Sequence, residues 1–106
     1  MPLDFHIAPE AAQFFPAPVL QLFPDEHEAI YDALGSDAVC PQLAAMRDYY
    51  ADAHYSGDAL QHLIGELHIL ATSPTASALA RDVATRLHAA AEQALSAHHT
   101  LYAIAD

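Results

Sequence analysis

Histidine and carboxylate side chains at helical spacing are the residues of this chain whose types could do chemistry. Eight histidines occur among its 106 residues, and within the expected helices two of them stand four positions before a glutamate, in the pairs His62–Glu66 and His88–Glu92. Residues four apart lie on the same face of a helix, where an imidazole and a carboxylate can share a metal ion. Asp58 lies one turn before His62. The His62–Glu66 pair is therefore the better candidate for a metal site.

The longer patterns that are typical of metal enzymes do not occur in the sequence. It has neither an HExxH motif nor the Glu-x-x-His repeat of di-iron bundles. We expect His88 and Glu92 on a solvent face, where such a pair is usually a weak surface contact. The sequence thus predicts no bound metal and no cofactor. A small ligand- or metal-binding helical bundle stays open as the alternative, with His62, Glu66 and a histidine from another helix as ligands.

The single cysteine, Cys40, is the one candidate for a nucleophile of the thiol type, with His54 as its base. It precedes an expected helix start at Pro41, where the helix dipole lowers a thiol pKa. No catalytic-cysteine signature surrounds it, however, and cysteine is among the most buried residue types. The chain also lacks a Ser–His–acid spacing and a glycine-rich phosphate loop. We expect a buried thiol and no enzymatic activity, and an enzyme that uses Cys40 or a histidine is the third hypothesis.

The charge of the chain restricts its partners. Fourteen acidic residues face three basic ones, and the net charge is −11. The three bases are Arg47, Arg81 and Arg86, so the first 46 residues carry none. A field of this sign repels phosphates, which argues against binding to nucleic acid or to an anionic membrane and favours a basic protein as partner. The sequence has no membrane-spanning run and no signal peptide at its start, so we expect a cytoplasmic protein.

The elements that must position these residues are predicted to be helices. Apolar periodicity and helix-start signals place four of them, over residues 25–34, 41–55, 58–71 and 73–102. Gly35 ends the first helix, Pro41 opens the second, and Ser73 caps the fourth with Pro74 at its first position. The apolar stripe of the second helix includes Tyr50. The stripe of the fourth includes His98, which is expected to be a core histidine.

The fold class that follows is an all-α antiparallel four-helix bundle in a single domain, residues 1–106. Residues 1–24 differ from the rest because they hold all four Phe and five of the seven Pro. We expect them to form an irregular segment that packs across the helices or against a second copy of the chain, with one short strand over LDFHI. Ile69 falls on the polar side of the third helix. A homodimer therefore stays open.

Acidic strips with a few apolar or aromatic residues follow the outer faces of the second and third helices. Asp48, Asp52 and Tyr55 share one of these faces, and the other begins with Asp58 and His62. A charged rim around a few anchoring side chains is typical of a protein–protein interface. The expected contact residues are Tyr49, Asp52, Tyr55, Asp58, His62 and Glu66.

Residues 50–67, YADAHYSGDALQHLIGEL, carry a resemblance to a known class of proteins. An aromatic residue and an aspartate end one helix, Tyr-Ser-Gly-Asp follows, and a Leu-x-x-Leu-x-x-Glu-Leu helix begins. This arrangement resembles small acidic helical bacterial proteins of the polymorphic-toxin immunity type, over less than a fifth of the chain. The resemblance implies a non-enzymatic protein that binds a cognate toxin in the cytoplasm of the producing cell. An acidic protein would gain electrostatically steered association with a basic toxin.

Overall fold

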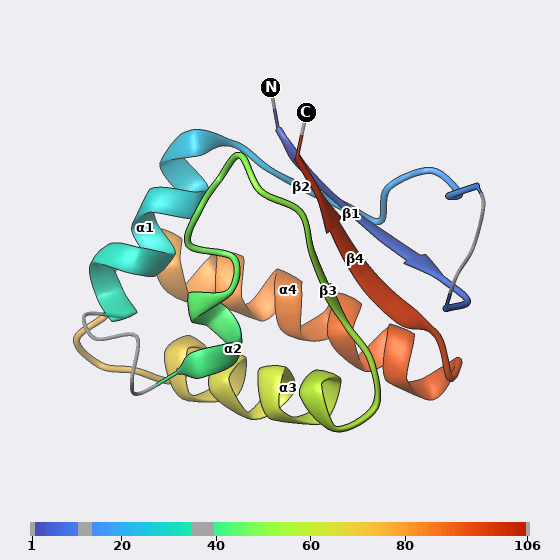
Figure 1. The fold of residues 1–106 in the computed structure, drawn as a ribbon. Helices are drawn as coiled ribbons and strands as arrows, with labels where there is room; N and C mark the ends of the chain where they lie inside the picture. The colour runs from blue at the N-terminus through green and yellow to red at the C-terminus, as the bar shows by residue number, and fades with distance from the viewer. Residues whose placement is uncertain (1, 11–13, 35–39, 106) are drawn as a thin grey trace.

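A four-stranded antiparallel sheet forms one layer of the computed structural model, which describes residues 2–10, 14–34 and 40–105 (Figure 1). The order of the strands in the sheet is β2-β1-β4-β3. Their bounds are β1, Leu3–Ala8; β2, Leu20–Leu22; β3, Ala53–Tyr55; and β4, Thr100–Ile104. The prediction of an all-α four-helix bundle is therefore wrong, and the protein has a mixed α/β fold.

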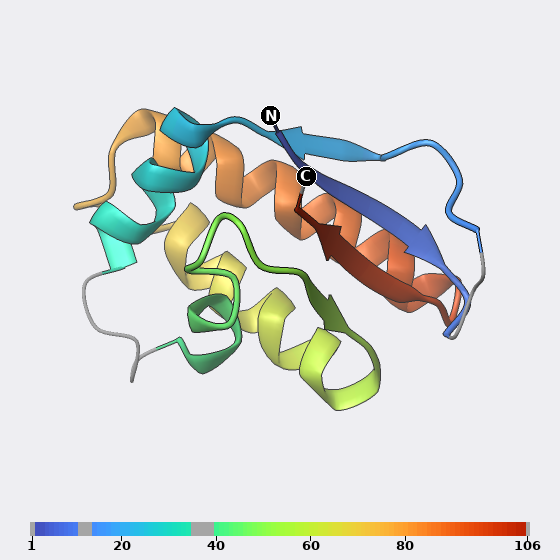
Figure 2. The same ribbon diagram turned by 45° about the horizontal axis from the view of Figure 1, so that its top comes forward.

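Four helices of the described residues form the second layer. They are α1, Pro24–Leu34; α2, Pro41–Ala44; α3, Gly57–Ala71; and α4, Ala78–Ser96. The long helices α3 and α4 lie side by side over one face of the sheet, and α1 packs against α4 at one end (Figure 2). No helix in the described residues has both the length and the apolar character needed to cross a membrane.

Two helix predictions agree closely with the structure, and a third agrees in part. Helices predicted over 25–34 and 58–71 correspond to α1 and α3. The last helix begins later than expected, because Ser77 caps it by accepting a hydrogen bond from the backbone N–H of Ala80 at 3.1 Å. Gly35, the predicted end of the first helix, lies outside the described residues.

The Phe- and Pro-rich start of the chain contains a regular strand, β1. Its side chains alternate between the two sheet faces: Leu3 and Phe5 are buried against the helices, whereas Asp4 and His6 point to the other face. The predicted strand over LDFHI is confirmed. The rest of the segment adds β2, which pairs antiparallel with β1.

The predicted fourth helix is too long because its last residues form a strand. In the structure α4 ends at Ser96, and His98 takes a left-handed backbone conformation with φ of 57°. The N–H of His99 then bonds to the carbonyl of Ala94, which closes the helix in a Schellman motif. His98 is therefore exposed in a turn rather than a core residue, and β4 leaves this turn to pair with β1 and β3.

The predicted second helix, 41–55, is also wrong for most of its length. Only Pro41–Ala44 is helical, and Ala53–Tyr55 is the edge strand β3. Tyr50, expected in an apolar stripe, is 81 % exposed. Apolar periodicity indicated a helix here, but strand pairing and side-chain hydrogen bonds from other elements override it.

An ion pair ties α1 to α4. The Arg86 guanidinium lies 2.7 Å from a carboxylate oxygen of Glu26 and 3.0 Å from one of Asp82. The other carboxylate oxygen of Glu26 accepts the N–H of Phe23, the residue before the helix. Burial raises the pKa of Glu26, but the hydrogen bonds from Phe23 and Arg86 outweigh it and hold the pKa below its usual value.

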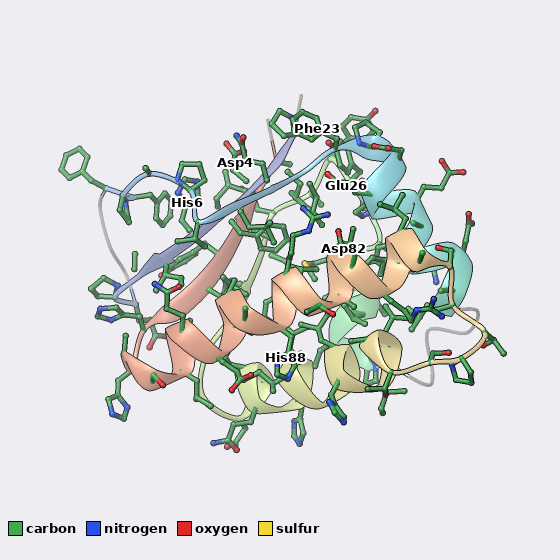
Figure 3. The ribbon with its side chains drawn as sticks, turned by 180° about the vertical axis from the view of Figure 1, so that it is seen from behind. Asp4, His6, Phe23, Glu26, Asp82 and His88 are labelled. Carbon is green, nitrogen blue, oxygen red and sulfur yellow. The ribbon has the colours of Figure 1, made fainter. Side chains whose placement is uncertain are left out.

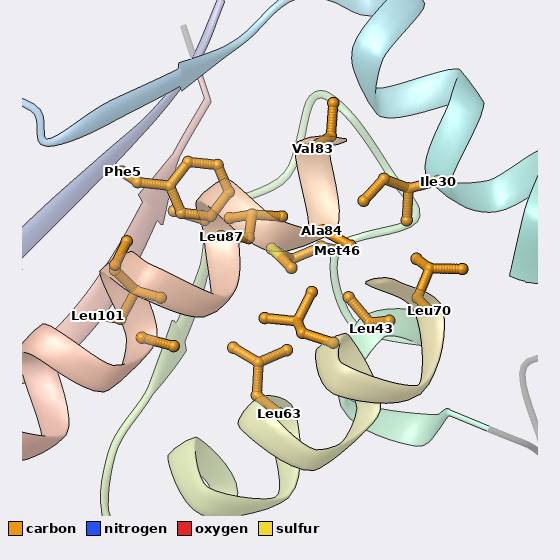
Figure 4. Close-up of a cluster of buried hydrophobic side chains, with 14 of the residues drawn as sticks. Phe5, Ile30, Leu43, Met46, Leu63, Leu70, Val83, Ala84, Leu87 and Leu101 are labelled. Atoms are coloured by element: carbon orange, nitrogen blue, oxygen red, sulfur yellow. The ribbon is translucent and has the colours of Figure 1, made fainter. Parts of the chain in front are cut away.

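The core fills the space between the sheet and the helices (Figure 4). Phe5 and Leu101 reach it from the sheet, and Leu63 and Leu87 reach it from α3 and α4. Small side chains let the helices approach closely. Four alanines of α4 have no exposed surface: Ala80, Ala84, Ala91 and Ala94.

Candidate partner-binding surface

The segment from Cys40 to Asp52 has little regular structure, yet other elements hold it in place. The carboxylate of Glu66, on α3, accepts the backbone N–H groups of Gln42 at 3.1 Å and Leu43 at 2.9 Å. These are free N–H groups in the first turn of α2. Glu66 is only 8 % exposed, so its charge is satisfied inside the protein by these N–H groups.

Hydroxyl groups hold the carbonyls of the same short helix. The Tyr55 hydroxyl, from β3, donates to the carbonyl of Gln42 at 2.7 Å, and the Tyr31 hydroxyl, from α1, donates to that of Leu43 at 2.6 Å. Burial beside Glu66 raises the pKa of Tyr55 far above its usual value. Tyr55 therefore keeps its proton and remains a donor.

Two further bonds fix the second half of the segment. His27, buried on α1, lies with Nε2 2.7 Å from the carbonyl oxygen of Met46. A carbonyl only accepts, so Nε2 carries the proton. The Tyr49 hydroxyl donates to the carbonyl of Leu22 at 2.9 Å, and the Tyr49 ring meets His27 edge-on. In the described residues every buried side-chain nitrogen or oxygen has a hydrogen-bond partner, and the bonds to this segment restrict its conformation.

The fixed segment carries exposed aromatic side chains. Tyr50 is 81 % exposed and meets the half-buried Tyr49 ring edge-on, with centroids 5.5 Å apart. The bond from Tyr49 to Leu22 brings this turn beside the start of α1, where Phe23 is 50 % exposed (Figures 1 and 3). We call Phe23, Tyr49 and Tyr50 the aromatic corner.

Acidic residues surround the aromatic corner. Asp25 follows Phe23 by two positions, and Asp48 and Asp52 flank the two tyrosines; all three are exposed. Asp48 accepts the N–H of Tyr50 at 2.9 Å, and Asp52 accepts that of Ala105 at 2.7 Å. Both carboxylates are therefore fixed in position by backbone bonds.

Each of the three basic side chains has a partner within the protein, although Arg47 is itself exposed. Arg86 pairs with α1 and α4 as described above, and Arg81 donates to the carbonyl of Ala76 at 2.9 Å. Arg47 lies over the Tyr31 ring at 4.9 Å. Acidic side chains remain at the surface. Three of them, on α1, line a groove of about 440 Å³: Asp25, Glu28 and Asp32. The outer surface is therefore strongly negative.

The structure separates the six residues expected to contact a partner. Tyr49 and Asp52 both lie at the aromatic corner. Asp58 and His62 are exposed on α3, but Asp58 follows β3 and Asp52 precedes it, so the two acids lie at opposite ends of that strand. The remaining two, Tyr55 and Glu66, are buried. They present no surface to a partner, and their role is to hold the segment that carries the corner.

The geometry gives little support to the two alternative hypotheses, a metal site at His62 and Glu66 and a nucleophile at Cys40. His62 is exposed whereas Glu66 is buried with both oxygens occupied, and the described residues contain no group of three or more His, Cys, Asp or Glu that could hold a metal ion. Cys40 is 2 % exposed, and His54 points outward from the sheet. Burial and the charge of Glu66 raise the pKa of Cys40, which opposes a thiolate nucleophile.

Sequence reasoning missed Phe23 and Tyr50 as surface residues. Phe23 lies in a segment expected to pack across the helices or against a second copy of the chain, and Tyr50 lies in a predicted apolar stripe. The signal that could have identified Tyr50 is the doublet Tyr49-Tyr50 between two aspartates. Comparisons with protein-family models, curated proteins and solved structures each found no match to this chain.

Proposed function

We propose that the protein is a non-catalytic interaction module of the immunity or inhibitor type, which binds a basic partner protein and occludes its active surface. The observation that carries this proposal is the aromatic corner, a group of exposed aromatic side chains on a strongly acidic surface. Such a protein would act in the cytoplasm of the cell that makes it, before the partner leaves that cell.

The chemistry of the corner suits this function. Exposed Tyr and Phe side chains that enter pockets on a partner are frequent energetic centres of protein interfaces. Acids around them attract basic side chains and raise the association rate. Side chains from three elements, α1, β3 and α3, hold the segment beforehand, so it loses little conformational freedom on binding. A toxin with Lys or Arg around its active site has the complementary surface.

The first experiment is affinity capture with matched variants. Wild-type protein, the double variant Phe23→Ala/Tyr50→Ala and the control Ile69→Ala/Leu79→Ala are each presented to a lysate of the cells that encode the chain. The control removes two other exposed apolar side chains, both on helices. We expect a basic protein to be retained by wild type and control and lost with the corner variant. Retention by all three variants would contradict the proposal.

The second experiment measures association with the purified partner. Charge reversal in Asp52→Lys/Asp58→Lys is expected to slow association at low salt, with a smaller difference at high salt because the charges are then screened. Inhibition of the partner's activity at one molecule of this protein per molecule of partner would establish occlusion. Equal association rates for variant and wild type would remove the electrostatic part of the argument.

A further inference from the structure

Two histidines face each other across the outer side of the α3–α4 interface. The rings of His68, on α3, and His88, on α4, have their centroids 6.2 Å apart, with 49° between the ring planes. Figure 3 shows His88 on the side of α4 next to α3. His68 is exposed and His88 is partly exposed, so solvent reaches the pair. Neither residue belongs to the aromatic corner.

A carboxylate orients one of the two rings. Nδ1 of His88 lies 2.7 Å from a carboxylate oxygen of Glu92, one turn further along α4. A carboxylate accepts, so Nδ1 carries the proton and Nε2 of the neutral ring keeps its lone pair. A carboxylate bonded to the far nitrogen of an imidazole is the usual second partner of a metal-ligating histidine, which it orients and makes more basic.

The distance between the rings suits two ligands of one ion. A metal–nitrogen bond of about 2.0–2.1 Å places a ring centre roughly 3.2 Å from the ion. Two rings bound to one ion at angles between a right angle and a straight line then have centres roughly 4.5–6.4 Å apart. The observed 6.2 Å lies at the wide end of this range, near the straight arrangement. The two rings must therefore rotate toward each other to reach the smaller angles of tetrahedral or cis coordination.

We propose that His68 and His88 together bind one divalent transition-metal ion of the nickel, copper or zinc type, with Glu92 positioning His88. Imidazole nitrogen is a preferred ligand of these ions. Water fills the other positions, because the described residues bring no third His, Cys, Asp or Glu ligand to the site. The negative surface of the protein raises the local concentration of cations.

The test is calorimetric titration of untagged protein with nickel chloride. We expect one ion per chain, with binding lost in His68→Gln and in His88→Gln. Glu92→Gln is expected to weaken binding about 10–100-fold, as for other carboxylates bonded to a metal-ligating histidine. His62→Gln, which removes another exposed histidine of α3, is the matched control and leaves binding unchanged.

Paramagnetic broadening of amide NMR signals locates the ion independently of affinity. Signals around residues 68 and 88 should broaden first when nickel is added, and this should not occur in the double variant His68→Gln/His88→Gln. Unchanged binding by that double variant, or no stoichiometric binding by wild type, would overturn the proposal. The substituted side chains lie on the outer side of the helices, and thermal unfolding of each variant verifies that it is folded.

Discussion

The carboxylate of Glu66 lies 2.9 Å from the backbone nitrogen of Leu43 and accepts its hydrogen bond, although the two residues are 23 positions apart. This bond joins the middle of α3 to the start of the four-residue helix α2. A helix so short does not persist by itself, because helix nucleation is costly. The conformation of the segment that carries Tyr49 and Tyr50 therefore depends on side chains outside it.

We predict that Glu66→Gln destabilises the protein by about 2–3 kcal/mol, because a buried charged acceptor of two N–H groups is lost and an amide NH₂ is placed against them. Urea unfolding measures the change. The control is Glu28→Gln, an exposed acid of α1, for which the change should stay within about 0.5 kcal/mol. Equal stability of the two variants would show that Glu66 does not hold the segment.

The thiol of Cys40 reports on the same segment. It is buried, and burial together with the charge of Glu66 raises its pKa, so we predict slow reaction with a thiol reagent in the native state. Glu66→Gln should accelerate labelling, because it removes the charge and releases the residues that cover the sulfur. The measurement is the rate at which a chromogenic thiol reagent releases its coloured product at pH 8. A native rate equal to that of urea-unfolded protein would contradict the burial of Cys40.

The ion pair between Glu26 and Arg86 should make part of the stability depend on pH. The pKa of Glu26 is lowered from 4.5, so the pair contributes fully above that value, and the contribution is lost as the pH falls through the folded-state value. We predict that Glu26→Gln lowers the free energy of unfolding by about 1 kcal/mol at pH 7 and by less at pH 3. Urea unfolding at both pH values tests this. Asp82→Asn, at the more exposed partner of Arg86, is the control and should show a smaller effect. A difference that grows in acid would have the wrong sign.

His98 occupies a backbone conformation that glycine adopts more readily. With φ of 57° at the Schellman position after α4, we predict that His98→Gly stabilises the protein by about 0.5–1 kcal/mol. Thermal unfolding should show a higher midpoint. His99→Gly is the control. Among the non-glycine residues described here only His98 has a positive φ, so glycine at position 99 relieves no strain and should lower the midpoint. A lower midpoint for His98→Gly would show that its side chain contributes more than the backbone strain costs.

Helices whose buried apolar side chains recur at the helical period could be predicted from the sequence. The leucines of α3 recur at the helical period, and four of them are buried at residues 60, 63, 67 and 70. Strand β4 could not be predicted this way, because Ala94, His98 and Leu101 continue the apolar spacing of α4 beyond its end. The turn between them contains no glycine. Pairing with a strand about 95 residues away decides the structure there.

The candidate surface could be predicted only in part. Asp52, Asp58 and His62 are exposed, as expected of polar side chains. Tyr55 and Glu66 have the residue types of an interface but serve as internal hydrogen-bond partners of α2. Their role depends on a segment distant in sequence, which local periodicity cannot reveal. Tyr50 is exposed because Tyr49, its neighbour, takes the inward position by bonding to Leu22.

The pairing of β1 with β4 has a consequence for synthesis on the ribosome. Asp4 pairs with Ile104, so β1 has no neighbour on that side until nearly a hundred further residues have been made. Helices α3 and α4 can form while the chain grows, but the sheet that covers them closes only after residue 104 has left the exit tunnel. Until then the apolar sides of these helices are open to chaperones and to other nascent chains.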